Sequence, residues 1–254
     1  MILAATCLIL QIKSIALDKQ TVIFKDLGII DYKKAWDYQE ELLQQNVKVK
    51  SDNRLLTTND QLSTTNYLLL CEHPAVYTLG KSGNPGNVLI DENEMQQKGI
   101  QFFNTNRGGD ITFHGLQQIV GYPILDLEKF YTDIGRYLRE LEEVIIYTLA
   151  EYNIKGERSK GETGVWIEPG VIDKERKICA MGVRCSRWIT MHGFALNINT
   201  DLDYFNNIIP CGIENKQVTS IEKELNKKVD FEEAKEKIKR NFEKVFNAEL
   251  INEQ

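Results

Sequence analysis

The stretch NRGGDITFHGLQQIVGYPILDL, residues 106–127, combines closely spaced glycines with two apolar runs that are typical of β-strands. Gly108 and Gly109 stand together after an arginine, and Gly115 follows a histidine. Glycine has no Cβ atom, so another group can approach its backbone closely. The pattern predicts either a binding segment that touches a ligand or a β-bulge or hairpin that does not. His114 is open to the same two interpretations, as a functional or as a structural histidine.

Length and composition are those of a globular protein. The 254 residues, 42% hydrophobic and 27% charged, are enough to bury a full core. A formal charge of −6 argues against binding to nucleic acid or to an anionic membrane. The charge is uneven, because residues 155–187 hold eight Lys or Arg against five Asp or Glu. We expect this basic segment to form a surface that meets an acidic partner.

The cysteines and the first residues bear on where the protein resides. The five cysteines are odd in number and contain no CxxC pair, which favours reduced thiols and a cytoplasmic location. The opening MILAATCLIL is apolar but lacks a basic leader region and a clear cleavage site. It is also shorter than the ~20 residues of a membrane span. We expect a strand or an upstream extension, with a lipoprotein-type leader as the alternative.

The order of apolar patterns predicts long helices between runs of strands. Asp31 and Asp133 precede helical patterns, and Asp91 begins a short helix that Gly99 ends. Strands are expected at 66–71, 75–80, 111–115, 119–127, 163–168, 177–186 and 187–199. In the helical C-terminal part, Thr219 with Glu222 and Asp230 with Glu233 fit capping boxes. The fold class is therefore α/β (α+β), a mixed, largely antiparallel sheet with packed helices. No repeat or linker divides the chain, so we expect one domain at 22–254 after an extension at 1–21.

Cys211 stands in the segment IIPCGIENKQVTS, between Pro210 and Gly212. These neighbours predict a tight, accessible turn, whereas Cys71 lies in an apolar run and is expected to be buried. Cys211 is thus either a nucleophile or an incidental loop cysteine. A nucleophilic thiol needs a nearby cation that lowers its pKa.

Two histidines and one lysine are candidates for that cation. His114 and His192 each precede a glycine, and Lys177 begins the strand-like KICAMGVRCS. Lysines are mostly surface charges, so Lys177 is also explained without a role in catalysis. A zinc site made of His73, His114 and His192 is disfavoured, because none has a ligand at familiar spacing. GGDITFHG does not match GxGxxG either, which disfavours a phosphate-binding loop.

Together these segments resemble the octanoyltransferases of lipoate biosynthesis, the lipoyl(octanoyl) transferase family. RGGDITFHG with GYPILDL resembles the family's RGG-x-x-T-[FY]-H-G segment. GVWI and KICAMGVRCSRWITMHGFALNIN resemble its lysine segment, and DLDYFNNIIPCGI with VTSIEKEL resembles its cysteine segment. Three motifs in the right order, over residues 22–225, make the resemblance specific. Where the family usually has HGPGQ, this chain has Leu116-Gln117 in place of Pro-Gly, so we expect that side of the pocket to be reshaped.

The resemblance implies a fold shared with the catalytic domains of lipoate-protein and biotin-protein ligases. It implies transfer of octanoyl from acyl carrier protein to a lysine of lipoyl domains, in 2-oxo acid dehydrogenases and the glycine cleavage system. No cofactor, metal, nucleic acid or membrane is implied. The implied catalytic residues are Cys211, which forms the acyl thioester, and Lys177, which lowers its pKa. The implied substrate-binding residues are Arg107, Gly108, Gly109, Asp110, Ile111, Thr112, Phe113, His114, Ala180, Met181, Gly182, Gly193, Phe194 and Ala195.

Three other functions remain open on the same sequence. An ATP-dependent lipoate or biotin ligase on this fold would make an acyl-adenylate and would need no thiol. An amidotransferase would move octanoyl between lipoyl domains. A catalytically inactive module would bind acyl carrier protein only, although the Cys211 turn and Lys177 argue against it.

Overall fold

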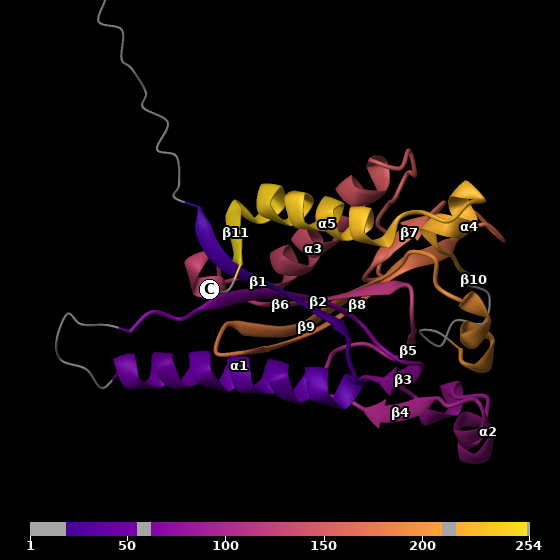
Figure 1. The fold of residues 1–254 in the computed structure, drawn as a ribbon, viewed down its shortest axis with the longest axis horizontal. Helices are drawn as coiled ribbons and strands as arrows, with labels where there is room; N and C mark the ends of the chain where they lie inside the picture. Colours follow the sequence, from indigo (N-terminus) through magenta and orange to yellow (C-terminus); the bar gives the residue numbers. More distant parts are fainter. Residues whose placement is uncertain (1–18, 55–61, 210–216, 253–254) are drawn as a thin grey trace, which may run out of the picture.

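The computed structural model describes residues 19–54, 62–209 and 217–252. Within these residues, an eight-stranded mixed sheet has one helix on one face and two helices on the other (Figure 1). Helix α1 (Tyr32–Asn53) covers the first face, and α3 (Ile134–Ala150) with α5 (Phe231–Phe246) covers the second. The sheet runs in the order β10-β8-β9-β6-β2-β1-β11, and β7 pairs with β8. Its strands are β1 (Gln20–Ile29), β2 (Asn66–Glu72), β6 (Gln118–Ile124), β7 (Val165–Ile167), β8 (Arg176–Ser186), β9 (Ile189–Asn197), β10 (Gln217–Val218) and β11 (Ala248–Asn252).

The pairing confirms the predicted mixed, largely antiparallel sheet. Strands β2, β6, β9 and β8 pair in antiparallel fashion, as does β7 with β8. The parallel pairs are β1 with β2, β1 with β11, and β10 with β8. Beside this sheet lies a small one, β4-β3-β5, built from β3 (Val76–Leu79), β4 (Gln101–Asn104) and β5 (Ile111–His114). The short helix α2 (Glu92–Gln97) leads into β4 (Figure 1).

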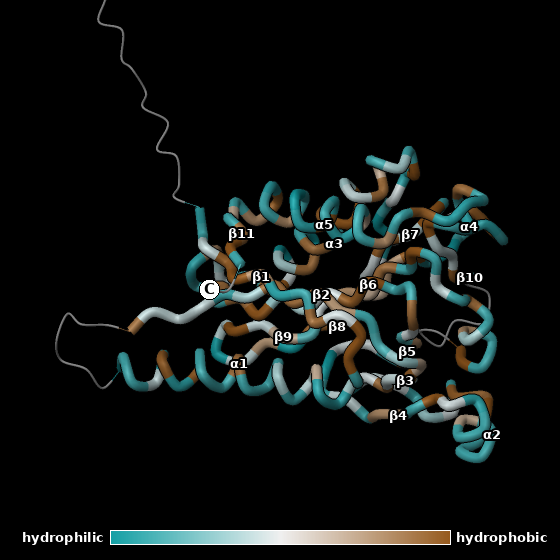
Figure 2. The backbone as a smooth tube through the Cα atoms, in the orientation of Figure 1, coloured by the Kyte–Doolittle hydropathy of each residue, from teal (hydrophilic) through white to brown (hydrophobic). Residues whose placement is uncertain are grey.

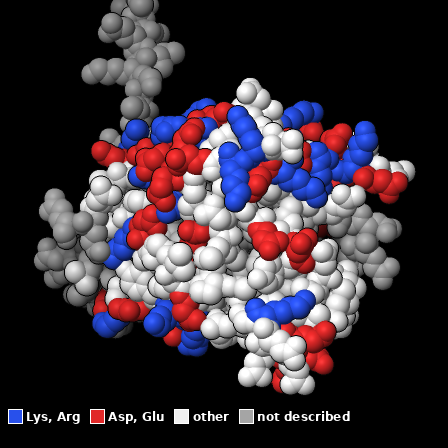
Figure 3. Space-filling view, turned by 45° about the vertical axis from the view of Figure 1, so that its right-hand side comes forward, with Lys and Arg blue, Asp and Glu red and all other residues white. Residues whose placement is uncertain are grey.

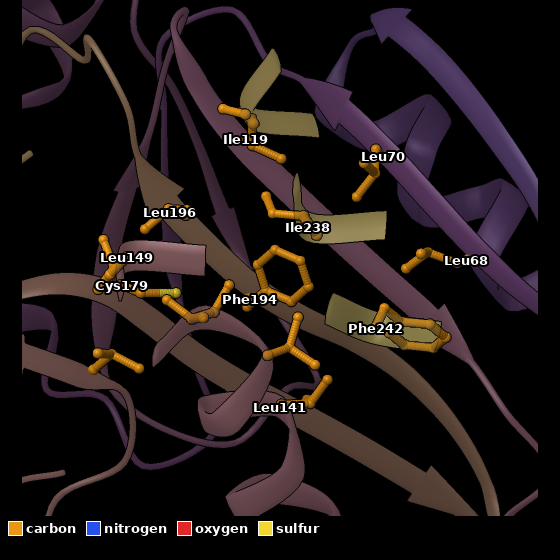
Figure 4. Packing of buried hydrophobic residues seen from close by; sticks show 14 of the residues in the cluster. Leu68, Leu70, Ile119, Leu141, Leu149, Cys179, Phe194, Leu196, Ile238 and Phe242 are labelled. Carbon is orange, nitrogen blue, oxygen red and sulfur yellow. The ribbon is translucent and has the colours of Figure 1, made fainter. Parts of the chain in front are cut away.

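Both faces of the central strands are buried because helices cover both faces. In β2, Leu68 and Leu70 contribute to the cluster packed under α3 and α5, and Figure 4 shows Leu68 close to Phe242. Leu69 and Cys71 contribute to the other cluster, under α1. Successive side chains of a strand point to opposite faces, so an uninterrupted apolar run suits a strand covered twice. Figure 2 shows the complementary pattern, with hydrophilic residues along the helices and hydrophobic ones among the strands.

The predicted helix starts are confirmed with one exception. The carboxylates of Asp31, Asp133 and Asp230 each accept a backbone N–H in the first turn of α1, α3 and α5, and Asp91 forms a full capping box. The prediction of Thr219 as a cap was wrong. Ser220 caps α4 (Ile221–Leu225) instead, because it accepts from the N–H of the third helical residue, whereas the Thr219 hydroxyl donates to Glu224.

The sequence did not predict the strands at the two ends of the described chain. Strand β11 follows α5 after Asn247, whose φ of 47° is left-handed and ends the helix. It pairs in parallel with β1, which begins at Gln20 and so includes two residues of the segment 1–21. Pairing of residues more than 200 positions apart leaves no local signal in the sequence. None of the described helices is both long and apolar enough to cross a membrane.

Several basic residues of the segment 155–187 form ion pairs with acidic groups, and the basic surface expected there for an acidic partner stays a prediction. Arg158 bonds to Glu142 and Glu143 on α3, and Arg184 lies 2.6 Å from a carboxylate oxygen of Glu40 on α1. Arg176 is paired likewise, with two glutamates. Figure 3 shows acidic and basic side chains interspersed on this side of the molecule, with uncharged surface between them. Part of the local positive charge therefore makes contacts within the protein.

Candidate active site

A largely apolar cavity of about 400 Å³ lies where β8 and β9 meet the small sheet and the start of α1. Small residues in register make room for it: Ala180 pairs with Ala195, and Gly182 pairs with Gly193. The structure brings most of the predicted site residues to its wall. They are Arg107, Gly109, Asp110, Ile111, Thr112, His114, Lys177, Ala180, Met181, Gly182, Gly193, Phe194 and Ala195.

Arg107 holds the glycine-rich loop in place from inside. Its side chain is buried, and its Nη2 donates to the carbonyl and hydroxyl oxygens of Thr78 at 2.6 and 2.9 Å. The same nitrogen donates to the carbonyl of Asp110 at 2.8 Å, and Nη1 donates to that of Gly108 at 3.0 Å. A planar, permanently charged guanidinium satisfies several carbonyl groups at once. The guanidinium of Arg107 thus fixes the shape of the cavity wall.

The glycines let the protein's own chains approach each other. A Cβ atom on Gly182 would lie 2.6 Å from the carbonyl oxygen of Gly108, and one on Gly80 would lie 2.3 Å from that of Gly109. Gly109 also adopts a φ of 88°, in the region that favours glycine. The Gly108 N–H is taken by the carbonyl of Val183, at 3.0 Å. At Gly182 and Gly80, the group that approaches the glycine closely is therefore the backbone of the glycine-rich loop itself.

Two predicted residues do not line the cavity. Gly108 packs against β8, and Phe113 points into the core of the small sheet, where its ring stacks 4.6 Å from that of Tyr204. Neither Leu116 nor Gln117, which stand in place of Pro-Gly, lines the cavity, and their effect on its shape stays a prediction. Gln117 has a φ of 62°, so it adopts the left-handed turn conformation that glycine adopts readily.

The histidines around the cavity are uncharged. Burial lowers the pKa of His114 to about 3 and that of His192 to about 3, with Arg107 as a further cause in both. Burial also lowers the pKa of His73 to about 4. His114 stacks on the ring of Tyr32, 5.8 Å away. Neither His114 nor His192 is thus the cation that a thiolate needs, and the described residues contain no cluster of His, Cys, Asp and Glu suited to a metal ion.

Lys177 is the cationic residue of β8 at the cavity. It is 9% exposed, and its ammonium lies 4.5 Å from the centre of the Trp166 ring. Its backbone pairs with Val218 in β10. Val218, which follows the Cys211 segment in the sequence, also lines the cavity. Phe205, which precedes that segment, lines it too.

Cys211 itself lies outside the described residues. The chain before it is held to the segment between β3 and α2, where the N–H of Ile209 donates to the carbonyl of Asn87 at 2.8 Å. The chain after it is held to β8 through Val218. The segment with Cys211 therefore runs in the sequence between two described points, of which Val218 lines the cavity.

Sequence reasoning missed the polar residues at the back of the cavity. Tyr32, Gln118, Tyr122 and Asn197 all line it and are all buried. Gln118 begins the apolar strand β6, and Asn197 ends the apolar strand β9. A polar residue at the end of a buried strand was the signal that could have indicated them. Each makes buried hydrogen bonds, which is the expected condition for a polar group inside a protein.

Comparison with protein families gives a match over most of the chain. The family model described as the lipoyl protein ligase A/B catalytic domain matches residues 31–243. A curated octanoyltransferase of Flavobacterium psychrophilum is 59% identical over 91% of this chain and 99% of its own length. One of Christiangramia forsetii is 58% identical over 89% of this chain and 96% of its own length.

Solved structures show the same fold at low identity. A bipartite lipoate protein ligase from Thermoplasma acidophilum, described together with its E2 lipoyl domain, has a TM-score of 0.63 at 16% identity. The match covers 93% of this chain and 87% of that one. A lipoate-protein ligase A bound with ATP has a TM-score of 0.63 at 13% identity, over 92% and 88% of the two chains. The predicted fold is thus confirmed.

Proposed function

The chain belongs to the lipoyl protein ligase A/B catalytic domain family, and we propose that it transfers octanoyl from octanoyl-acyl carrier protein to a lysine of lipoyl domains. Its curated relatives are octanoyltransferases, so it is an acyltransferase of protein lipoylation. The acyl donor, the acceptor and the covalent intermediate are the parts that we propose. The acceptor domains would belong to 2-oxo acid dehydrogenases and the glycine cleavage system, and the site of action would be the cytoplasm.

The reaction would proceed in two steps without ATP or metal. In the first, Cys211 Sγ attacks the octanoyl carbonyl, a new thioester forms, and the carrier's thiol leaves with a proton. In the second, the amine of the acceptor lysine attacks the enzyme thioester, an amide forms, and Cys211 leaves as the thiol. Lys177 would hold the thiolate by its charge and pass protons in both steps. The second step is downhill because an amide replaces a thioester.

The observation that carries the proposal is the position of Lys177. It lies at a largely apolar cavity, and its strand pairs with the residues that follow the Cys211 segment. The cavity wall contains apolar side chains such as Ile111, Met181 and Phe194. These suit an alkyl chain, since each methylene removed from water contributes about 0.8 kcal/mol. A buried ammonium next to an acyl site is what thiol activation by a lysine requires.

The ATP-dependent ligase reaction is the main competing function on this fold. The lipoate-protein ligase A that resembles this chain in fold was solved with ATP, which is a property of that protein. The curated relatives, at much higher identity, carry the name of a transferase. A ligase would transfer the acyl group only after ATP is added, and it would not depend on Cys211. An amidotransferase would accept octanoyl from a lipoyl domain in place of the carrier protein.

Trapping of the intermediate tests the proposal. The purified protein, mixed with octanoyl-carrier protein in the absence of ATP, should gain one octanoyl group in its intact mass. Peptide mapping should place the group on Cys211, and neutral hydroxylamine should release it. Cys211→Ser should prevent the adduct, whereas the matched Cys179→Ser and Cys185→Ser variants should retain it. Transfer that requires ATP, or transfer by wild-type protein with the adduct never on Cys211, would contradict the mechanism.

A further inference from the structure

A line of buried hydrogen bonds crosses the back of the cavity, starting at the glycine-rich loop. Arg107 Nη2 donates to the hydroxyl oxygen of Thr78 at 2.9 Å, and this oxygen lies 3.4 Å from His114 Nε2. On the other side of the ring, His114 Nδ1 lies 2.9 Å from Gln118 Oε1. All four residues are buried.

The line continues from Gln118 to the strand that carries Lys177. Gln118 Nε2 donates to Asn197 Oδ1 at 2.8 Å, and Asn197 Nδ2 donates to the carbonyl of Thr219 at 2.9 Å. The N–H of Thr219 then donates to the carbonyl of Lys177 at 3.0 Å. The hydrogen bonds thus connect two walls of the cavity that are far apart in the sequence.

Two backbone carbonyls fix the orientation of the two side-chain amides in this line, those of Asn197 and Gln118. The carbonyl of Thr219 can only accept, so Asn197 must present its NH₂ there and its oxygen to Gln118. The carbonyl of Phe113 can also only accept, and Gln118 Nε2 lies 3.2 Å from it. Gln118 Oε1 therefore faces His114, so the hydrogen of this neutral imidazole lies on Nδ1. Its Nε2 is left as an acceptor for the hydroxyl of Thr78.

We propose that Gln118 is a positioning residue, whose side-chain amide sets the tautomer of His114 and joins the Arg107 loop to the Thr219–Lys177 strand pair. Gln118 is 1% exposed and donates two hydrogen bonds while accepting one, so its geometry is fixed on every side. Its effect on catalysis rests on the proposed function, because that function gives Lys177 its chemical role. A displacement of about 1 Å at a catalytic group costs about a hundredfold in rate.

The tautomer can be measured without any substrate. The chain has three histidines, so ¹⁵N signals of the rings can be assigned with single substitutions at His73 and His192. We expect His114 to carry its hydrogen on Nδ1 between pH 6 and 8. In Gln118→Leu we expect a mixture of tautomers, because the acceptor facing Nδ1 is gone. An Nε2–H tautomer in the wild-type protein, or an unchanged Nδ1–H tautomer in Gln118→Leu, would overturn the proposal.

A near-isosteric carboxylate tests the link to Lys177. In Gln118→Glu the ionised side chain donates nothing, so its oxygens face the Phe113 carbonyl and Asn197 Oδ1 without hydrogens. We expect octanoyl transfer at saturating donor to fall ten- to hundredfold at pH 8, with a smaller change in KM. Protonation of the introduced carboxylate restores one donor, so the rate relative to wild type should recover toward pH 6.

The control and the outcomes separate this proposal from the proposed function. Gln97→Glu makes the same chemical change at an exposed position on α2 and should leave the rate and its pH profile unchanged. A loss in Gln118→Glu that is equal at every pH would contradict the positioning role. If the wild-type protein transfers no octanoyl, the proposed function fails, while the tautomer measurement still decides whether Gln118 orients His114.

Discussion

The ammonium of Lys177 lies 4.5 Å from the centre of the Trp166 ring, across the pair of strands β7 and β8. A cation over an aromatic face is stabilised by about 0.5–2 kcal/mol, more when water is excluded, and both residues are buried. The ring thus restrains the charge of Lys177 at the cavity without accepting its protons.

The first prediction separates the charge of Lys177 from its proton. Lys177→Ala should slow octanoyl transfer by about 10²–10⁴-fold, the usual contribution of a proton-transferring group. Lys177→Arg keeps the charge but does not release a proton, so it should restore alkylation of Cys211 by iodoacetamide more than it restores transfer. Lys174→Ala, an exposed neighbour, serves as the control and should change neither. Equal recovery of both activities in Lys177→Arg would argue against proton transfer by Lys177.

The second prediction concerns stability in mild acid. Burial lowers the pKa of His73 to about 4, and those of His114 and His192 to about 3, whereas an unfolded histidine titrates near 6.5. The unfolded chain therefore binds more protons, and the stability is complete above pH 6.5 and falls as the pH drops toward 4. By pH 5, protonation of the unfolded chain at each histidine should have lowered the free energy of unfolding by roughly 2 kcal/mol. Glu142, whose pKa is raised by burial, acts in the opposite direction.

Urea unfolding followed by tryptophan fluorescence at pH 8, 6.5 and 5 measures this loss. His192→Asn should weaken the pH dependence by the share of one histidine. Asparagine also tolerates the left-handed backbone at this position, where φ is 57°. A pH dependence as steep in His192→Asn as in the wild-type protein would show that His192 is not held neutral.

The helices and central strands were predictable because their signals are local. Asp31 and Asp230 cap their helices through atoms two or three residues away, and the apolar runs of β2 and β6 need no distant partner to be recognised. Strand β11 was missed because it depends on pairing with β1, more than 200 positions away. Thr219 was wrongly predicted as the cap of α4 because its backbone pairs with the distant Lys177, which leaves the local cap to Ser220.

The candidate site was predictable in its residues and less so in their roles. The resemblance led to Arg107 and the glycines as substrate-binding residues, but the structure gives them partners within the protein. Side-chain direction decides which predicted residues line the cavity. Phe113 and His114 are adjacent but point to different sides of β5, and only His114 lines the cavity. The paired charges of 155–187 show the same limit, because Arg184 meets Glu40 only in the folded chain.

The third prediction uses the left-handed residue Gln117. Its side chain accepts from Asn199 Nδ2 at 2.8 Å, while its φ of 62° costs about 1 kcal/mol relative to glycine. Gln117→Ala loses the hydrogen bond and keeps the strain, so it should destabilise the protein by about 1 kcal/mol. Gln117→Gly loses the bond but removes the strain, so it should lie close to the wild type. Chemical denaturation checks the order, and an alanine variant more stable than the glycine variant would contradict it.

The last prediction tests whether the cavity holds the acyl chain. Ala195 is 3% exposed, lines the cavity and pairs with Ala180, so a larger side chain there should occupy space inside the cavity. Ala195→Leu adds three carbons, and excluding two or three methylenes of the substrate would cost about 1.6–2.4 kcal/mol. We expect KM for octanoyl-carrier protein to rise by roughly 15- to 50-fold, since 1.4 kcal/mol is a factor of ten. A butanoyl donor, which reaches less far into the cavity, should be much less affected.

Leu116→Ala, at an exposed position outside the cavity, should leave the KM values of both donors unchanged. Equal losses for octanoyl and butanoyl in Ala195→Leu, with an unchanged melting temperature, would mean that the chain does not bind beside Ala195.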